Sequence, residues 1–95
     1  MYLEIVSPEA TLFAHEVDSV IVPGVDGEFQ LLNNHAAIVS LLGQGFVKIK
    51  TKSQLTVDDL HTEVVPSNND KKLLTLKINS GTIEMKDNKV IILAD

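Results

Sequence analysis

The 95-residue sequence predicts an all-β domain, a flattened sandwich or barrel built from many short strands. Apolar residues recur with a period of two along several segments, which is the pattern of half-buried strands. Glycine, asparagine and aspartate separate these segments at short intervals. A hydrophobic fraction of 44% with a net charge of −5 indicates a globular core and excludes a disordered chain. This length fits a single domain, 1–95.

The first hairpin is expected around Gly24–Gly27. Taking these residues as the connection pairs Val22 with Phe29 and Val20 with Leu31, so that the apolar residues share one face. The glycines then supply backbone angles that other residues resist. Further strands are expected at Tyr2–Ser7, Ile38–Leu42 and Leu74–Asn79.

The segment FVKIKTK, Phe46–Lys52, has the clearest alternation in the chain. Three residues are expected to face the core: Val47, Ile49 and Thr51. The lysines between them are expected to form a solvated outer face, because successive side chains of a strand point to opposite sides. Such lysines also discourage association between strand edges.

A second hairpin is expected in TIEMKDNKVIIL, with Asp87-Asn88 as its two-residue turn. Both residue types tolerate a positive φ angle. This register sets Met85 opposite Val90 and, further along, Ile83 opposite Ile92, all on one face. The other face is mixed, since Glu84 faces Ile91, and we expect Val90–Leu93 to be a central strand.

One segment, 53–72, departs from the strand pattern. Its apolar residues Val57, Leu60, Val64 and Val65 follow a helical spacing, and Pro66 would stop a helix there. We expect an extended loop or a short helix here, followed by a polar loop tip at 67–72.

The composition excludes several kinds of chemistry. All eight basic residues are lysines and there is no cysteine, so arginine clamps, thiolate metal sites and disulfides are absent. An acidic chain without arginine is also a poor ligand for nucleic acid. The three histidines, His15, His35 and His61, lie far apart in the sequence and form no metal-ligand pair.

The glycine-rich loop is not a phosphate site by its pattern. The residues after Gly27 are those of a strand, whereas phosphate loops lead into a helix. Asp26 and Glu28 would also repel an anion. No nucleophile and base lie in a recognisable arrangement, so we expect no catalytic residue, no cofactor and no metal.

Four blocks of sequence resemble one family in order and spacing: YLEIVSPEATLF, EVDSVIVPGVDGEFQLLNNHAAIVSLL, GFVKI and SGTIEMKDNKVIILAD. They are similar to the epsilon subunit of bacterial F-type ATP synthases. The resemblance implies a flattened β-sandwich of about ten strands in two sheets. It further implies a non-catalytic rotor subunit of the central stalk, bound to the gamma subunit and to the c-ring and coupling proton flow to ATP synthesis.

The resemblance also carries expectations for individual residues and for location. Glu28 matches the acidic position in the loop that meets the c-ring. Ser7, His35 and Ser40 match positions on the side that meets gamma. The family works at the cytoplasmic face of the plasma membrane, as a peripheral part of the synthase.

Three departures from the family pattern are visible. Ala37 stands where the family has proline, which leaves a backbone N–H and should loosen that turn. The segment 51–72 is longer than usual. The chain also stops at Leu93-Ala94-Asp95, where most members continue into two inhibitory helices, and we expect either a natural short form or a piece of a longer protein.

An alternative remains open from the residues alone: a stand-alone small sandwich that binds a ligand or peptide in a pocket or on a strand edge. Catalysis by a small hydrolase would instead depend on His35. No apolar run approaches the roughly 20 residues that span a bilayer. The opening residues lack a signal-peptide pattern, so we expect membrane association only through partners.

Overall fold

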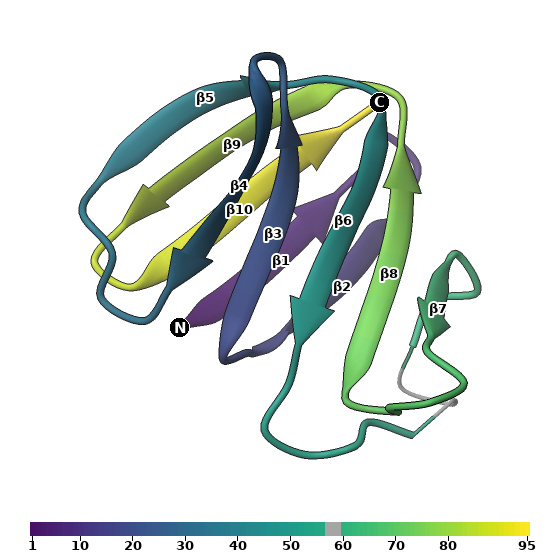
Figure 1. The fold of residues 1–95 in the computed structure, drawn as a ribbon. Helices are drawn as coiled ribbons and strands as arrows, with labels where there is room; N and C mark the ends of the chain where they lie inside the picture. The colour runs from purple at the N-terminus through teal and green to yellow at the C-terminus, as the bar shows by residue number, and fades with distance from the viewer. Residues whose placement is uncertain (57–59) are drawn as a thin grey trace.

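The computed structural model describes residues 1–56 and 60–95, which form ten strands and no helix (Figure 1). No described segment is therefore a helix that could cross a membrane. The predicted all-β class is confirmed. The strands are β1 Tyr2–Val6, β2 Thr11–Glu16, β3 Ser19–Gly24, β4 Gly27–Leu32, β5 Ile38–Leu42, β6 Gly45–Lys50, β7 Val64–Pro66, β8 Leu73–Ile78, β9 Gly81–Lys86 and β10 Lys89–Ala94.

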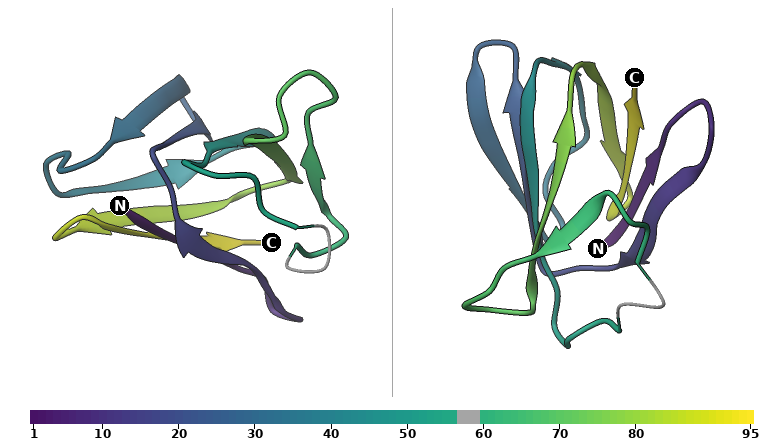
Figure 2. Two further views of the ribbon diagram at one scale, coloured as in Figure 1. Left: turned by 90° about the horizontal axis from the view of Figure 1, so that it is seen from below. Right: turned by 90° about the vertical axis from the view of Figure 1, so that its right-hand side faces the viewer.

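The strands form two facing layers (Figure 2). The first layer has the order β2-β1-β10-β9-β5, and the second has the order β4-β3-β6-β8-β7. The layers are not separate sheets, because Gly24 of β3 pairs with Leu42 of β5 and joins them into one hydrogen-bonded sheet. The result is a sandwich that is nearly a closed barrel.

Both predicted hairpin registers are confirmed. Val22 pairs with Phe29 and Val20 with Leu31, and the ladder continues to Gly24 and Gly27. The first turn is therefore only two residues long, Val25-Asp26, and Gly27 has a φ of +126° there. Positive φ at that position explains the glycine.

The second hairpin has the predicted turn. Asp87 and Asn88 have φ angles of +53° and +61°, as a tight turn between twisted strands requires. Met85 lies opposite Val90, and Ile83 lies opposite Ile92. β10 lies between β1 and β9, so the expectation of a central strand is confirmed.

The core lies between the two layers and is made of the inward-facing residues of nearly every strand. Its fully buried members include Leu3, Ile5, Val20, Leu31, Ile49, Leu74, Leu76, Ile83, Met85 and Ile92. Thr51 is the one buried polar residue among the described residues, and its hydroxyl donates to the carbonyl oxygen of Ser53 at 2.7 Å. A buried hydroxyl needs such a partner, since an unpaired one costs free energy of folding.

Strand β2 was not predicted, and its geometry explains why. Its register with β1 shifts between Ile5 and Val6, which is a bulge. Leu12 and Phe13 are consequently both buried although they are neighbours in the chain. A bulge removes the period-two signal because an extra residue re-aims the side chains that follow it.

The segment 53–72 contains no helix in its described residues, and it includes the unpredicted strand β7. Val64 is buried opposite Leu76 of β8, whereas Val65 is exposed, which is the alternation of a strand. Leu60 packs against the core from an irregular turn. Val57, on which the expected helical spacing also rested, lies outside the described residues.

Adjacent residues of β10 provide a test of this packing. Ile92 is fully buried, so Ile92→Ala should lower the free energy of unfolding by about 2–5 kcal/mol. Leu93 points outward, so Leu93→Ala should change it by no more than about 0.5 kcal/mol. Urea denaturation followed by circular dichroism measures both values. Equal losses in the two variants would contradict the assignment of β10's faces.

Candidate functional site

Glu28 is the second residue of β4 and is exposed. It follows the β3–β4 turn, which protrudes at the top of Figure 1. Its carboxylate lies 3.0 Å from the ammonium of Lys48, which belongs to β6 on the other side of β3. The side chains are 52% and 41% exposed, so the pair is solvated and worth little to stability. The pair nevertheless balances the negative charge of Glu28 with the positive charge of Lys48, one of the three lysines expected on the outer face of that strand.

Glu28 and Ser40 line the same hollow, at the side of the sandwich where β4 and β5 diverge. The hydroxyl of Ser40 donates to the carbonyl oxygen of Leu41 at 3.3 Å. The residues that line this hollow are Gly24, Val25, Asp26, Gly27, Glu28, Phe29, Ile38 and Ser40. The structure thus brings together one residue expected at the c-ring and one expected at gamma.

His35 lies in the exposed connection between β4 and β5. Its backbone N–H donates to the carbonyl oxygen of Leu32 at 3.1 Å, and its ring Nδ1 lies 2.8 Å from the carbonyl oxygen of Ala36. The backbone N–H of Asn34 donates to Oδ1 of Asn88 at 2.7 Å. This loop is therefore tied to the turn between β9 and β10.

Ser7 lies at the opposite end of the first layer. β1 pairs in parallel with β10 from Tyr2, next to the Asn88 turn, to Val6 beside Leu93. At about 3.3 Å per residue, Ser7 is on the order of 17 Å from the end that holds the His35 loop. Its hydroxyl accepts from the backbone N–H of Ala10 at 3.3 Å. The three residues expected at gamma do not form one cluster.

The outer face of the first layer carries an apolar surface that the sequence analysis missed. The pairing of β5, β9, β10 and β1 places Leu41 and Leu93 in one row across the sheet, two strands apart, with Val6 beyond them. Leu41 and Leu93 are 62% and 55% exposed, and neighbouring Val39 is 77% exposed. We call Val6, Val39, Leu41, Ile91 and Leu93 the outer apolar face.

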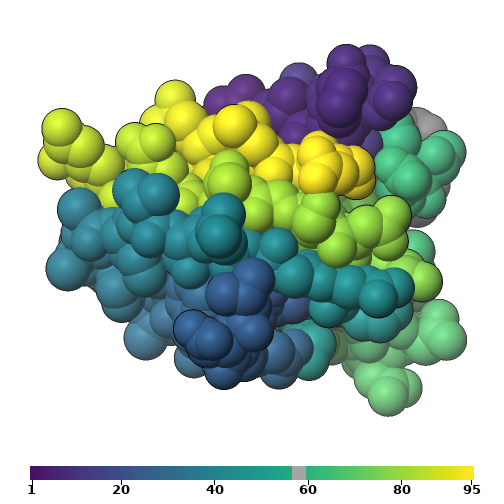
Figure 3. Space-filling view, turned by 90° about the horizontal axis from the view of Figure 1, so that it is seen from above, coloured from purple at the N-terminus to yellow at the C-terminus, as the bar shows by residue number. Residues whose placement is uncertain are grey.

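β9 contributes polar residues to this face: Thr82 lies between Leu41 and Leu93, and Glu84 lies between Val39 and Ile91. A face that exposes several large apolar side chains beside polar ones is typical of interaction surfaces. Each of these residues looked like an ordinary member of a strand in the sequence. Only long-range pairing brings them together, so no local signal could have revealed the surface. In the view of Figure 3, the C-terminal residues in yellow lie directly beside the N-terminal segment in purple, at one end of this layer.

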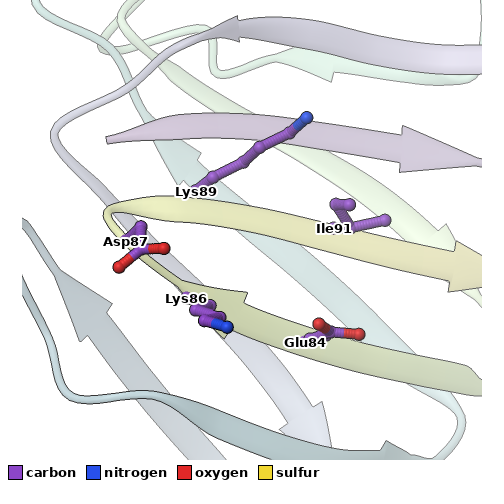
Figure 4. Close-up of a pocket in the computed structure, with 5 residues that line it drawn as sticks. All are labelled: Glu84, Lys86, Asp87, Lys89 and Ile91. Carbon is purple, nitrogen blue, oxygen red and sulfur yellow. The ribbon is translucent and has the colours of Figure 1, made fainter.

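A shallow hollow on the same layer shares Ile91 with the outer apolar face and is otherwise lined by charged residues (Figure 4). Its lining residues are Glu84, Lys86, Asp87, Lys89 and Ile91, all from β9, β10 and their turn. The ammonium of Lys89 lies 5.8 Å from the centre of the Tyr2 ring, a cation–π contact. Charges of both signs on an open strand surface do not select a ligand, and none of the predicted residues is here.

No group of side chains among residues 1–56 and 60–95 is arranged to hold a metal ion. No three histidine or acidic side chains there lie close enough to share an ion. The ring of His15 contacts that of Phe13 edge-on at 5.0 Å. Nδ1 of His61 accepts from the backbone N–H of Glu63 at 3.1 Å. These imidazoles therefore have local structural contacts.

Comparison with known proteins supplies the family. The model of the family "ATP synthase, Delta/Epsilon chain, beta-sandwich domain" matches residues 1–58. The ATP synthase epsilon chain of Campylobacter curvus is 37% identical over 95 residues, covering 100% of this chain. That of Leptospira interrogans is 37% identical over 93 residues. The chain spans about 60% of the length of these relatives.

Solved structures show the same fold. A chain in the central stalk and c-ring structure of the Tetrahymena thermophila mitochondrial ATP synthase matches 99% of this chain with a TM-score of 0.74, at 15% identity. A chain of the Euglena gracilis mitochondrial ATP synthase gives a TM-score of 0.72 at 17% identity. The family model covers more than half of the chain, and the chain therefore belongs to the ATP synthase delta/epsilon family through its β-sandwich domain.

Proposed function

We propose that this chain serves as the non-catalytic epsilon subunit of a proton-translocating F-type ATP synthase. In this role it forms part of the central stalk, binds gamma and the c-ring, and couples proton flow to ATP synthesis. It lies at the cytoplasmic face of the plasma membrane and reaches the membrane only through the complex. The family match over residues 1–58 is the observation that carries the proposal.

The outer apolar face is the surface on which we place the contact with gamma. A partner lying across β5, β9, β10 and β1 would cover Leu41 and Leu93 and reach Ser7 at the end of β1. It would also pass over the strand that holds Ser40. This contact accounts for Ser7, whereas Ser40 faces the hollow beside β4 and His35 lies in the loop between β4 and β5.

The hairpin of β3 and β4 supports a separate contact with the c-ring. Its two-residue turn projects from the second layer, and Glu28 lies at its base (Figure 1). Since Lys48 pairs with Glu28, this surface offers a balanced polar patch, with Asp26 as an additional carboxylate. Charges at the edge of a contact set orientation and association more than affinity.

Rotor coupling also requires a stiff body between two contact surfaces. The close-packed core supplies that stiffness, because interdigitated side chains resist compression. The chemistry of ATP synthesis belongs to other subunits in this proposal. The chain needs no cofactor to act in this way.

The direct test is binding of the recombinant chain to purified gamma, and of that complex to the c-ring. Glu28→Lys should weaken ring binding about threefold to tenfold, because it reverses a charge at the contact and repels Lys48. Gamma binding should be unchanged. Glu63→Lys, an equal charge change at an exposed residue just before β7, is the matched control.

Two results would contradict this function. A folded wild-type chain that binds neither partner at micromolar concentration would exclude the stalk role. Equal loss of gamma and ring binding in folded Glu28→Lys would show that the two surfaces are assigned wrongly.

The surface for gamma has its own test. Leu93→Asp should lower gamma affinity at least tenfold, because it puts a charge into the centre of an apolar contact. Leu73→Asp, on the second layer, is the control and should bind as the wild type does. Isothermal titration calorimetry measures both. If Leu93→Asp and Leu73→Asp bind gamma with equal affinity, gamma does not bind at the outer apolar face.

A further inference from the structure

The outer face of β6 and β8 combines basic and apolar side chains. The two strands lie side by side in the second layer (Figure 1), and their pairing sets Phe46 opposite Lys77 and Lys50 opposite Leu73. Residues that lie opposite each other in an antiparallel ladder point to the same side of the sheet. All four are exposed, Phe46 by 49% and Leu73 by 37%. We call these four residues the basic face.

The positive charges of the basic face are not balanced by the layer that carries them. Glu28 is the only acidic residue in the five strands of the second layer, and its carboxylate pairs with Lys48, which lies between the two pairs of the basic face. Neither Lys50 nor Lys77 forms an ion pair within residues 1–56 and 60–95. Each of these ammonium groups lies instead beside an exposed apolar side chain.

Lysine is concentrated on this part of the sandwich. The chain has a net charge of −5, yet six of its eight lysines belong to β6 and β8 or lie within two residues of these strands, namely Lys48, Lys50, Lys52, Lys71, Lys72 and Lys77. Such a concentration produces a local positive potential on an otherwise acidic protein, which attracts anionic groups. The basic face is therefore a candidate surface for an anionic partner.

An anionic bilayer suits this face poorly. Each lysine near such a bilayer contributes about 1 kcal/mol, so the two lysines of the face supply about 2 kcal/mol. That is less than the contribution of one myristoyl chain, which itself binds only marginally. The net charge of −5 also opposes approach to an anionic surface.

A second copy of this chain suits the face poorly as well. The basic face would have to meet a different, acidic surface of the second copy, and contacts between unlike surfaces do not close into a dimer unless the rotation forms a ring. Two copies also repel each other through their equal net charges. A segment of another protein, with carboxylates and apolar side chains together, is the better match.

The spacing of the lysines indicates the form of that segment. Lys77 lies opposite Phe46, and Lys50 lies four residues further along β6, so they are on the order of 13 Å apart along the strands. Carboxylates two turns apart on a helix are separated by about 11 Å, a difference that long lysine side chains can span. Helices commonly cover the face of a sheet.

We propose that the basic face binds an acidic, amphipathic helix of a protein other than gamma and the c-ring. Carboxylates of this helix pair with Lys50 and Lys77, and its apolar side chains cover Phe46 and Leu73. The contact goes beyond the proposed function, because it lies on the layer opposite the outer apolar face and does not use the pair of Glu28 with Lys48.

A synthetic helix serves as the probe. The peptide is alanine-rich and about 18 residues long, because shorter peptides are marginal helices in water. It carries glutamates two turns apart with leucines on the same face. Fluorescence anisotropy should show that the wild-type chain binds it at least tenfold more tightly than a copy with glutamine in place of glutamate. The difference should shrink as salt rises from about 50 to 500 mM.

Charge reversals locate the peptide on the chain. Lys50→Glu combined with Lys77→Glu should weaken binding at least tenfold, because two attractions become repulsions. Lys86→Glu combined with Lys89→Glu, an equal charge change on the first layer, is the matched control and should stay within about twofold of wild type. Gamma binding should be unchanged in the first variant. Circular dichroism establishes that both variants are folded.

Chemical coupling in cell membranes that contain the chain identifies the natural partner. A carbodiimide joins an ammonium and a carboxylate that are in direct contact by an amide bond, and the reagent takes up the water that is released. Mass spectrometry should find Lys50 or Lys77 joined to an aspartate or glutamate of a protein other than gamma and the c subunit. Lys86 is the internal control and should not form this link.

The outcomes separate this inference from the proposed function. Equal affinity for the glutamate and glutamine peptides, or equal affinity of the two double variants, overturns the inference and leaves the stalk role intact. Coupling of Lys50 and Lys77 only to gamma, to the c subunit or within the chain also overturns it. Binding to vesicles with about 30% phosphatidylglycerol that is lost in the Lys50 and Lys77 variant would make the occupant a lipid surface. A chain that binds the acidic peptide but not gamma would exclude the stalk role alone.

Discussion

The junction between β3 and β5 is the constraint on which the rest of the fold depends. The backbone N–H of Gly43 donates to the carbonyl oxygen of Pro23 at 2.8 Å, and that of Val25 donates to the carbonyl oxygen of Leu41. A Cβ atom on Gly45 would lie 2.8 Å from the Cβ atom of Pro23, so the chain can turn there only with glycine. This close approach carries the chain from one layer to the other and sets the inward faces of both against each other.

Much of the fold could be predicted because its strongest signals are local. Asp87-Asn88 and the alternation on each side of it determine the register of one hairpin, as Gly24–Gly27 does for the other. β2 could not be predicted because its bulge buries two neighbouring residues and so removes the alternation of buried and exposed side chains. β7 could not be predicted because the run of Val64 and Val65 is too short to distinguish the spacing of a strand from that of a helix.

The functional surfaces could not be predicted in the same way, because they are products of long-range pairing. Leu41 and Leu93 are distant in sequence, and the sheet places them on either side of Thr82 in one row. Lys48 looked like one of three solvated lysines, yet its strand lies beside β3 and brings it to Glu28. Individual residues such as Ser7 and His35 were identified by resemblance alone, and they lie at opposite ends of the first layer. They lie too far apart to line one pocket.

The two proposed contact regions lie on different layers, and the junction between β3 and β5 holds these layers together. A load applied to the outer apolar face reaches the β3–β4 hairpin through the packed core, through the junction of β3 with β5, and through the segments of chain that connect the two layers, such as those between β4 and β5 and between β8 and β9.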